Sequence, residues 1–79
     1  MNEILPSVLV VDDELQIRRF LRTGFELDGF GVSEAETGTE ALRAAALKPS
    51  DLVILDLGLP DMDGSEVLER LRAWSSVPL

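Results

Sequence analysis

The sequence contains no cysteine and no histidine. Without cysteine the chain forms no disulfide, offers no thiol nucleophile and has no thiolate with which to bind a metal. Without histidine it lacks an imidazole base and the usual ligands of a zinc site. Nucleophilic triads that depend on either residue are therefore excluded. The chemistry left to the chain is that of carboxylates, hydroxyls and guanidinium groups.

Long apolar runs are also missing. No stretch approaches the ~18 apolar residues of a transmembrane helix, and the first residues lack the basic and apolar regions of a secretory signal. We therefore expect a cytoplasmic protein that makes no membrane contact. The formal net charge of −8 repels nucleic-acid phosphates, so no direct nucleic acid contact by this segment is expected. The acidity is equally compatible with a general role in solubility.

The composition is that of a small globular domain. The chain has 79 residues, of which 46% are apolar and 28% charged, so neither disorder nor a second domain is expected. Short apolar runs alternate with segments of helical periodicity. Runs rich in β-branched residues predict buried strands at residues 8–11 and 52–55, and a weaker pattern predicts an edge strand at residues 30–35.

A helical segment follows the first strand and another follows the second. The first helix is predicted by apolar residues and one glycine at helical spacing: Ile17, Phe20, Leu21, Gly24 and Phe25. Gly29 stands where a left-handed C-terminal residue is expected. Thr37 and Glu40 form a capping box that opens the second helix, and Pro49 marks the loop after it.

A third helix is predicted after the last of these strands. Asp63 resembles a second N-cap, and Val67, Leu68 and Leu71 follow along one helical face. Residues 77–79 resemble the beginning of a fourth strand. The order β-α-β-α-β-α, with right-handed crossovers, predicts an α/β fold in which helices cover both faces of a doubly wound parallel sheet.

Three aspartates carry most of the functional information. Asp12 and Asp13 end the first apolar run, and Asp56 ends the third strand. In an open parallel sheet, ligands bind at the carboxyl ends of the strands. If strands one and three are neighbours, as in a sheet of order 2-1-3, the three carboxylates share one pocket and repel one another. Mg²⁺ relieves such repulsion by binding a few oxygens, so the pattern predicts a magnesium site.

Each of these residues also has a purely structural explanation. Asp12 and Asp13 can cap a helix, and Asp56 can be a turn residue at a strand end. Their joint occurrence, in this order and at this spacing, favours the metal site. Gly58 offers a backbone carbonyl to a metal at close approach, and its role as a turn glycine is equally open.

The motifs resemble those of the receiver domain of bacterial two-component response regulators. Val-Asp-Asp-Glu (residues 11–14) follows the first strand, and Leu-Asp-Leu-Gly-Leu-Pro-Asp-Met-Asp-Gly (residues 55–64) ends the third. With Leu-Arg-Ala-Trp-Ser-Ser-Val-Pro (residues 71–78), they look most like the OmpR-type transcriptional regulators, and among these the regulators of potassium-transport (Kdp) operons. The resemblance covers residues 7–79.

The resemblance implies a flavodoxin-like (CheY-like) sheet of order 2-1-3. It implies that Asp56 accepts a phosphoryl group from the phosphohistidine of a sensor histidine kinase, in order to control transcription. Asp13 would ligate Mg²⁺ directly, Asp12 would bind it through water or assist, and the Gly58 carbonyl would supply a further ligand. The domain would be a phosphoacceptor and not an enzyme.

Members of the family also have elements that lie beyond this sequence. Receivers use a Ser or Thr at the end of strand four and a Lys at the end of strand five, so residues 1–79 are expected to form a single partial receiver domain, truncated after the third helix. Lys48, the one lysine, lies near the end of the second helix and cannot take that place. With strand three at an exposed edge, we expect self-association through this edge, or a homodimer.

Three other functions differ in how well they fit the sequence. A truncated, non-switching receiver would act as a protein-interaction module, and phosphoryl transfer to Asp56 distinguishes it from a working phosphoacceptor. An EF-hand does not fit, because Leu59 and Arg70 stand where that motif requires acidic residues. A phosphatase of the haloacid-dehalogenase type also uses an aspartate at a strand end, but its second acid would stand where Gly58 does.

Overall fold

The computed structural model describes residues 5–79. Three strands alternate with three helices along the chain: β1 (Ser7–Val11), α1 (Leu15–Leu27), β2 (Gly31–Ala35), α2 (Gly38–Leu47), β3 (Leu52–Leu55) and α3 (Gly64–Arg72). Every element predicted from residues 8 to 71 is present in the predicted order. None of the helices in the described part of the chain is long and apolar enough to cross a membrane.

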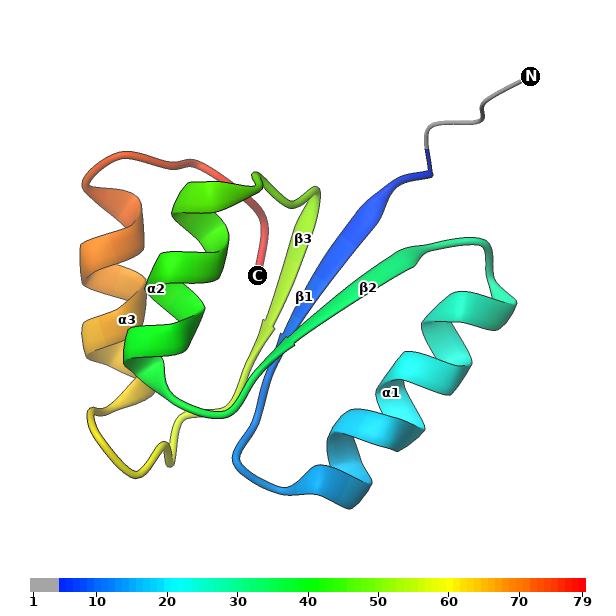
Figure 1. Cartoon of the computed structure of the whole chain (residues 1–79). Helices are drawn as coiled ribbons and strands as arrows, with labels where there is room; N and C mark the ends of the chain where they lie inside the picture. The colour runs from blue at the N-terminus through cyan, green and yellow to red at the C-terminus, as the bar shows by residue number, and fades with distance from the viewer. Residues whose placement is uncertain (1–4) are drawn as a thin grey trace.

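The strands form one parallel sheet of order β2-β1-β3. In the centre, Val11 pairs with Ala35 of β2 on one side and with Leu55 of β3 on the other. Figure 1 shows α1 on one side of the sheet and α2 with α3 on the other. The predicted doubly wound α/β fold and its 2-1-3 strand order are thus confirmed.

The main core lies between the sheet and the pair α2–α3. Its buried members come from all three strands, both helices and the loop that follows β3: Leu9, Val11, Ala35, Ala41, Ala45, Val53, Leu59, Val67 and Leu71. Val8 and Val10, whose exposed fraction is 0%, alternate with this set and point to the opposite face. β1 is therefore buried on both faces, which explains why its sequence is a continuous apolar run.

The side of α1 that faces the sheet differs from a simple apolar stripe. Phe20 is 77% exposed, whereas Arg18, two positions earlier, is only 7% exposed. At the far end of the helix, the rings of Phe25 and Phe30 meet edge to face with their centroids 5.5 Å apart. The apolar spacing correctly predicts a helix, but it does not identify the buried arginine.

The predicted helix ends are confirmed with one exception. Gly29 has a φ of 89°, the left-handed conformation expected after α1. The Thr37 hydroxyl accepts a hydrogen bond from the Glu40 N–H at 3.1 Å, and the Glu40 carboxylate accepts one from the Glu36 N–H at 2.9 Å. Asp63 is the N-cap of α3, but its side chain makes no capping hydrogen bond, so the second predicted cap is right in position and wrong in its contact.

A carboxylate from the loop after β3 binds the first turn of α2. One oxygen of Asp61 accepts a hydrogen bond from the Gly38 N–H at 2.7 Å, and the other accepts from the Thr39 N–H at 3.0 Å and the Thr39 hydroxyl at 2.8 Å. These N–H groups have no partner within the helix, and the helix dipole favours a negative charge beside them. The hydrogen bonds from Gly38 and Thr39 lower the pKa of Asp61 below its ordinary value of 3.8.

The last residues lie beside β3, on the edge that β1 does not occupy. The Val53 N–H donates a hydrogen bond to the Pro78 carbonyl at 2.9 Å, and Val77 packs against the core. Residues 77–79 do not form a regular strand. Because this segment covers part of the β3 edge, self-association through that edge stays a prediction.

A pair of glycine substitutions tests the packing on which the site depends. In Gly64→Ala the new Cβ would lie 2.7 Å from the Leu57 Cα and 2.8 Å from the Asp56 carbonyl oxygen, so we expect a loss of ~1–3 kcal/mol in the free energy of unfolding. In Gly24→Ala the Cβ meets nothing within 4 Å apart from its chain neighbours and the backbone of its own helix, so we expect a gain of ~0.5–1 kcal/mol from the higher helix propensity. Urea unfolding followed by circular dichroism measures both, and equal stabilities for the two variants would contradict the close approach at Gly64.

The acid dependence of stability tests the Asp61 contact. Because the pKa of Asp61 is lowered on folding, its ionised form stabilises the fold above pH 3.8, and this contribution is lost as the pH falls below that value. We expect Asp61→Asn to be less stable than the parent at neutral pH, with a difference that shrinks in acid. Urea unfolding over a pH series measures this difference, with Asp28→Asn, an exposed carboxylate at the end of α1, as the control. A difference independent of pH would contradict the assignment.

Candidate metal centre

The ends of β1 and β3 bring the three predicted aspartates together. Asp12 directly follows β1 and Asp56 directly follows β3, and the Asp56 N–H donates to the Val11 carbonyl at 2.9 Å, which continues the ladder between the two strands. One carboxylate oxygen from each of Asp12, Asp13 and Asp56 lies within 4.8 Å of the other two. The structure thus confirms the predicted cluster as a spatial arrangement.

Each strand end turns through a hydrogen bond to an aspartate side chain. Asp12 Oδ1 accepts from the Glu14 N–H at 2.9 Å, and Asp56 Oδ1 accepts from the Gly58 N–H at 3.2 Å. In both turns the carboxylate bonds to the backbone two residues later, which fixes its orientation. One oxygen of each side chain shapes the local turn, and the second oxygen is available to a ligand.

The cluster carries uncompensated negative charge. Within residues 5–79, none of the four ion pairs involves Asp12, Asp13 or Asp56. Asp12 and Asp56 are half-buried and Asp13 is exposed, so water screens their mutual repulsion only in part. Three carboxylates held this close without a basic partner favour a cation of high charge density.

The donor set fits a hydrated Mg²⁺ ion. Magnesium binds oxygen at ~2.0–2.1 Å, so two oxygens on opposite sides of the ion would be ~4.2 Å apart. The three carboxylate oxygens lie within 4.8 Å of one another, which is close to this distance. With one contact made through a bound water, all three residues would hold the ion. The residues present therefore fit the metal.

The loop that follows Asp56 is anchored at several points. Leu59 is 8% exposed and belongs to the core, Gly58 and Asp63 form an antiparallel bridge, and the Gly64 N–H donates to the Leu57 carbonyl at 3.0 Å. A Cβ at Gly58 would meet nothing within 4 Å apart from its chain neighbours. The turn at Gly58 is confirmed, and the part of its carbonyl in metal binding stays a prediction.

Two residues that hold the surroundings of the cluster were not singled out from the sequence. Arg18 is buried beside the end of β1, and Asp61 binds the start of α2. A local signal existed for Arg18, because it lies three positions before Leu21 and seven before Phe25, on their side of the helix. No local signal existed for Asp61, whose partners are 22 and 23 residues away in the sequence.

Comparison with known proteins assigns the family. The model of the response regulator receiver domain matches residues 8–79. The chain is 56% identical over 75 residues to the KDP operon transcriptional regulatory protein KdpE of Escherichia coli (strain K12), covering 95% of the chain and 33% of that protein. It is 57% identical over 72 residues to the transcriptional regulatory protein KdpE of Mycobacterium tuberculosis, covering 91% of the chain and 32% of the relative. The chain therefore spans about a third of the length of these regulators, and the predicted similarity to Kdp regulators is confirmed.

Solved structures show the same fold. The response regulator protein TrrA of Thermotoga maritima, in complex with Mg²⁺-BeF, matches with a TM-score of 0.88 and 36% identity over 94% of the chain and 64% of that protein. A receiver domain from Methylobacillus flagellatus matches with a TM-score of 0.86 and 32% identity over 91% of the chain and 61% of its own length. Family, fold and acidic cluster agree, and the chain belongs to the response regulator receiver domain family.

Proposed function

We propose that this protein is a phosphoacceptor receiver domain in which Asp56 accepts a phosphoryl group from the phosphohistidine of a sensor histidine kinase in the presence of Mg²⁺. The observation that carries the proposal is the approach of Asp12, Asp13 and Asp56 to within 4.8 Å at the ends of adjacent strands. In the regulators that the chain resembles, such a domain would serve to control transcription. We place it in the cytoplasm, where it would meet the kinase.

Each acidic residue has a distinct role in this proposal. Asp13, whose side chain is exposed, would ligate Mg²⁺ directly, and Asp12 would bind it through water. Asp56 would contribute an oxygen to the same ion, and the Gly58 carbonyl would supply a further ligand. When bound, Mg²⁺ neutralises charge on the transferring phosphoryl group.

The hydrogen bond at Asp56 selects the attacking atom. Because Asp56 Oδ1 accepts from the Gly58 N–H, the lone pairs of Oδ2 are the better nucleophile. Oδ2 forms a bond to phosphorus while the bond between phosphorus and the histidine nitrogen breaks, and the nitrogen takes the electron pair. The Gly58 N–H then donates to the carbonyl oxygen of the acyl phosphate. The phosphoryl group of the product carries ~1.5–2 negative charges, but the carboxylate gives up its own charge when the bond forms, so the net gain is about one charge, which bound Mg²⁺ would help to offset.

Two solved structures of one similar protein support the cofactor and the partner. The structure of TrrA that resembles this chain was solved in complex with Mg²⁺-BeF. A second structure holds the histidine kinase ThkA in complex with TrrA, and its match to this chain has a TM-score of 0.85 and 38% identity. By analogy, we propose Mg²⁺ as the cofactor and a histidine kinase as the partner of this chain.

Phosphoryl transfer is tested by the intact mass of the protein after incubation with acetyl phosphate. With Mg²⁺ we expect the mass of one added phosphoryl group, and without Mg²⁺ we expect little or none. Asp56→Asn should abolish the addition, because an amide is a poor nucleophile. Asp28→Asn, which removes an exposed carboxylate at the end of α1, is the matched control and should be modified like the parent. A folded parent that gains no phosphoryl group would contradict the proposal and favour the non-switching interaction module.

Metal binding is tested by the difference in stability between Asp13→Asn and the parent, which should change sign when Mg²⁺ is added. Without Mg²⁺ the variant should be more stable than the parent, because one of three repelling charges is removed. At a Mg²⁺ concentration about 100 times the dissociation constant of the parent, the parent gains ~2.7 kcal/mol and the variant gains less. Thermal unfolding with and without Mg²⁺ measures both effects. A variant that is less stable than the parent in both conditions would contradict the role of Asp13.

A further inference from the structure

Arg18 is the one charged residue that is buried in the described part of the chain, with an exposed fraction of 7%. Removing a guanidinium group from water is unfavourable unless the group is paired and hydrogen-bonded. An apolar residue at this position of α1 would fill the same space without that cost. The contacts of Arg18 must therefore account for the presence of an arginine here.

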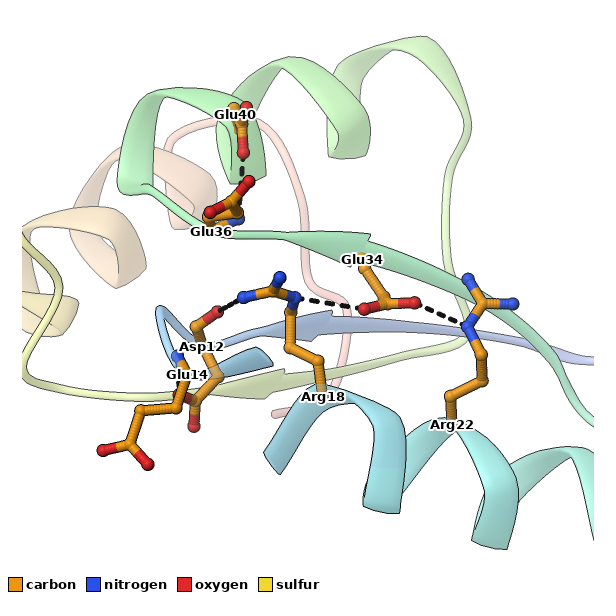
Figure 2. A network of polar contacts seen from close by, with 7 residues as sticks. All are labelled: Asp12, Glu14, Arg18, Arg22, Glu34, Glu36 and Glu40. Atoms are coloured by element: carbon orange, nitrogen blue, oxygen red, sulfur yellow. Dashed lines mark hydrogen bonds and ion pairs between the residues drawn. The ribbon is translucent and has the colours of Figure 1, made fainter. Parts of the chain in front are cut away.

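The Arg18 side chain connects α1 with both β2 and the end of β1. Its Nε donates to Glu34 Oε1 at 3.0 Å, and its Nη1 donates to the Asp12 carbonyl oxygen at 2.7 Å. The second oxygen of Glu34 accepts from Arg22. Figure 2 shows the guanidinium group of Arg18 between Asp12 on one side and Glu34 on the other. Only the planar fork of an arginine supplies two donors in these two directions.

The hydrogen bond from Arg18 is one of three that hold the turn at Asp12. The Asp12 N–H donates to the Ala35 carbonyl at 3.0 Å, its side chain accepts from the Glu14 N–H, and its carbonyl accepts from Arg18. Of these three contacts, only that of Arg18 comes from the side chain of a residue outside the turn. The direction in which the chain leaves β1 thus depends on Arg18.

The side chain of Asp13 has no such support of its own. It is exposed and makes no hydrogen bond to the described residues. Its direction follows from the backbone between Asp12 and Glu14, which Arg18 holds in place. A metal site gains affinity when its ligands are held in the binding geometry before the ion arrives.

We propose that Arg18 is a positioning residue of the metal site, which holds the turn at Asp12 so that the carboxylates of Asp12 and Asp13 are preorganised for Mg²⁺. This inference rests on the proposed function, because it concerns the affinity of that site for its metal. Arg18 touches neither the metal nor the phosphoryl group and acts through the backbone of Asp12.

Whether Mg²⁺ binding becomes weaker or tighter when Arg18 is replaced distinguishes a positioning role from a simple electrostatic effect. Arg18 carries a positive charge close to a cation site, so removal of that charge alone would tighten Mg²⁺ binding. Loss of positioning would weaken it. The control is Arg22→Met, because Arg22 also pairs with Glu34 but does not contact Asp12. Both variants remove one positive charge from the same network, and only Arg18→Met removes the contact with the turn.

The test measures the Mg²⁺ dissociation constant by isothermal titration calorimetry and the order parameters of the Asp13 and Glu14 amides by NMR in the metal-free protein. For Arg18→Met we expect about tenfold weaker binding, equivalent to ~1.4 kcal/mol, and a fall of the order parameters from ~0.85 towards ~0.6. For Arg22→Met we expect parental order parameters and binding within about twofold of the parent.

Each other outcome is decisive. Unchanged or tighter binding in Arg18→Met, or equal loss of order in both variants, would overturn the proposal. If the parent binds no Mg²⁺, the proposed function fails, and the order parameters of the metal-free proteins still decide whether Arg18 positions the turn. If Arg18→Met does not fold, Arg18→Lys takes its place. It retains the charge but lacks the planar fork that donates to Asp12 and Glu34 in two directions, so the same loss of order is expected.

Discussion

The double pairing of β1 is the constraint on which the remainder of the structure depends. β1 is hydrogen-bonded to β2 along one edge and to β3 along the other, and Val8 and Val10 are fully buried. A strand in this position admits only apolar side chains until it leaves the sheet. Charged residues can therefore first appear directly after Val11. Because Val11 pairs with Leu55, the acidic residues that follow the two strands necessarily meet.

Bringing these carboxylates together requires supports that offset their repulsion, and the supports are polar contacts to the backbone. Arg18 holds the carbonyl of Asp12, and Asp61 ties the loop after β3 to α2. Gly64 lets the first turn of α3 approach the carbonyl of Asp56 more closely than a Cβ would permit. A functional site held in this way keeps its geometry without a ligand, which is the condition for preorganised binding.

Sequence signals between near neighbours in the chain predict most of this fold. They do not predict contacts between residues that are far apart in the sequence. The capping box at Thr37 and the left-handed Gly29 depend on neighbours within four residues, so the sequence suffices to predict them. Asp63 has the right position for an N-cap, but the sequence does not determine where its side chain points. The burial of Arg18 and the contact of Asp61 with α2 depend on strand order and helix placement. Such contacts become predictable only once the topology is known. The acidic cluster also required the 2-1-3 strand order, which the family resemblance implied, because only the carboxyl ends of adjacent parallel strands lie together.

The two halves of the candidate site are held by supports of unequal strength. The half that contains Asp12 and Asp13 is held by Arg18, which is 7% exposed, so salt and solvent screen its contacts little. The half that contains Asp56 is held by the pairing of β3 with β1 and by the buried Leu59, whereas its polar support, Asp61, is exposed and makes hydrogen bonds that weaken with salt and acid. Salt and acid therefore act on the polar support of the loop after β3 and little on that of the acidic pair at the end of β1. Because the proposed metal site takes ligands from both halves, its geometry depends on the buried contacts in each.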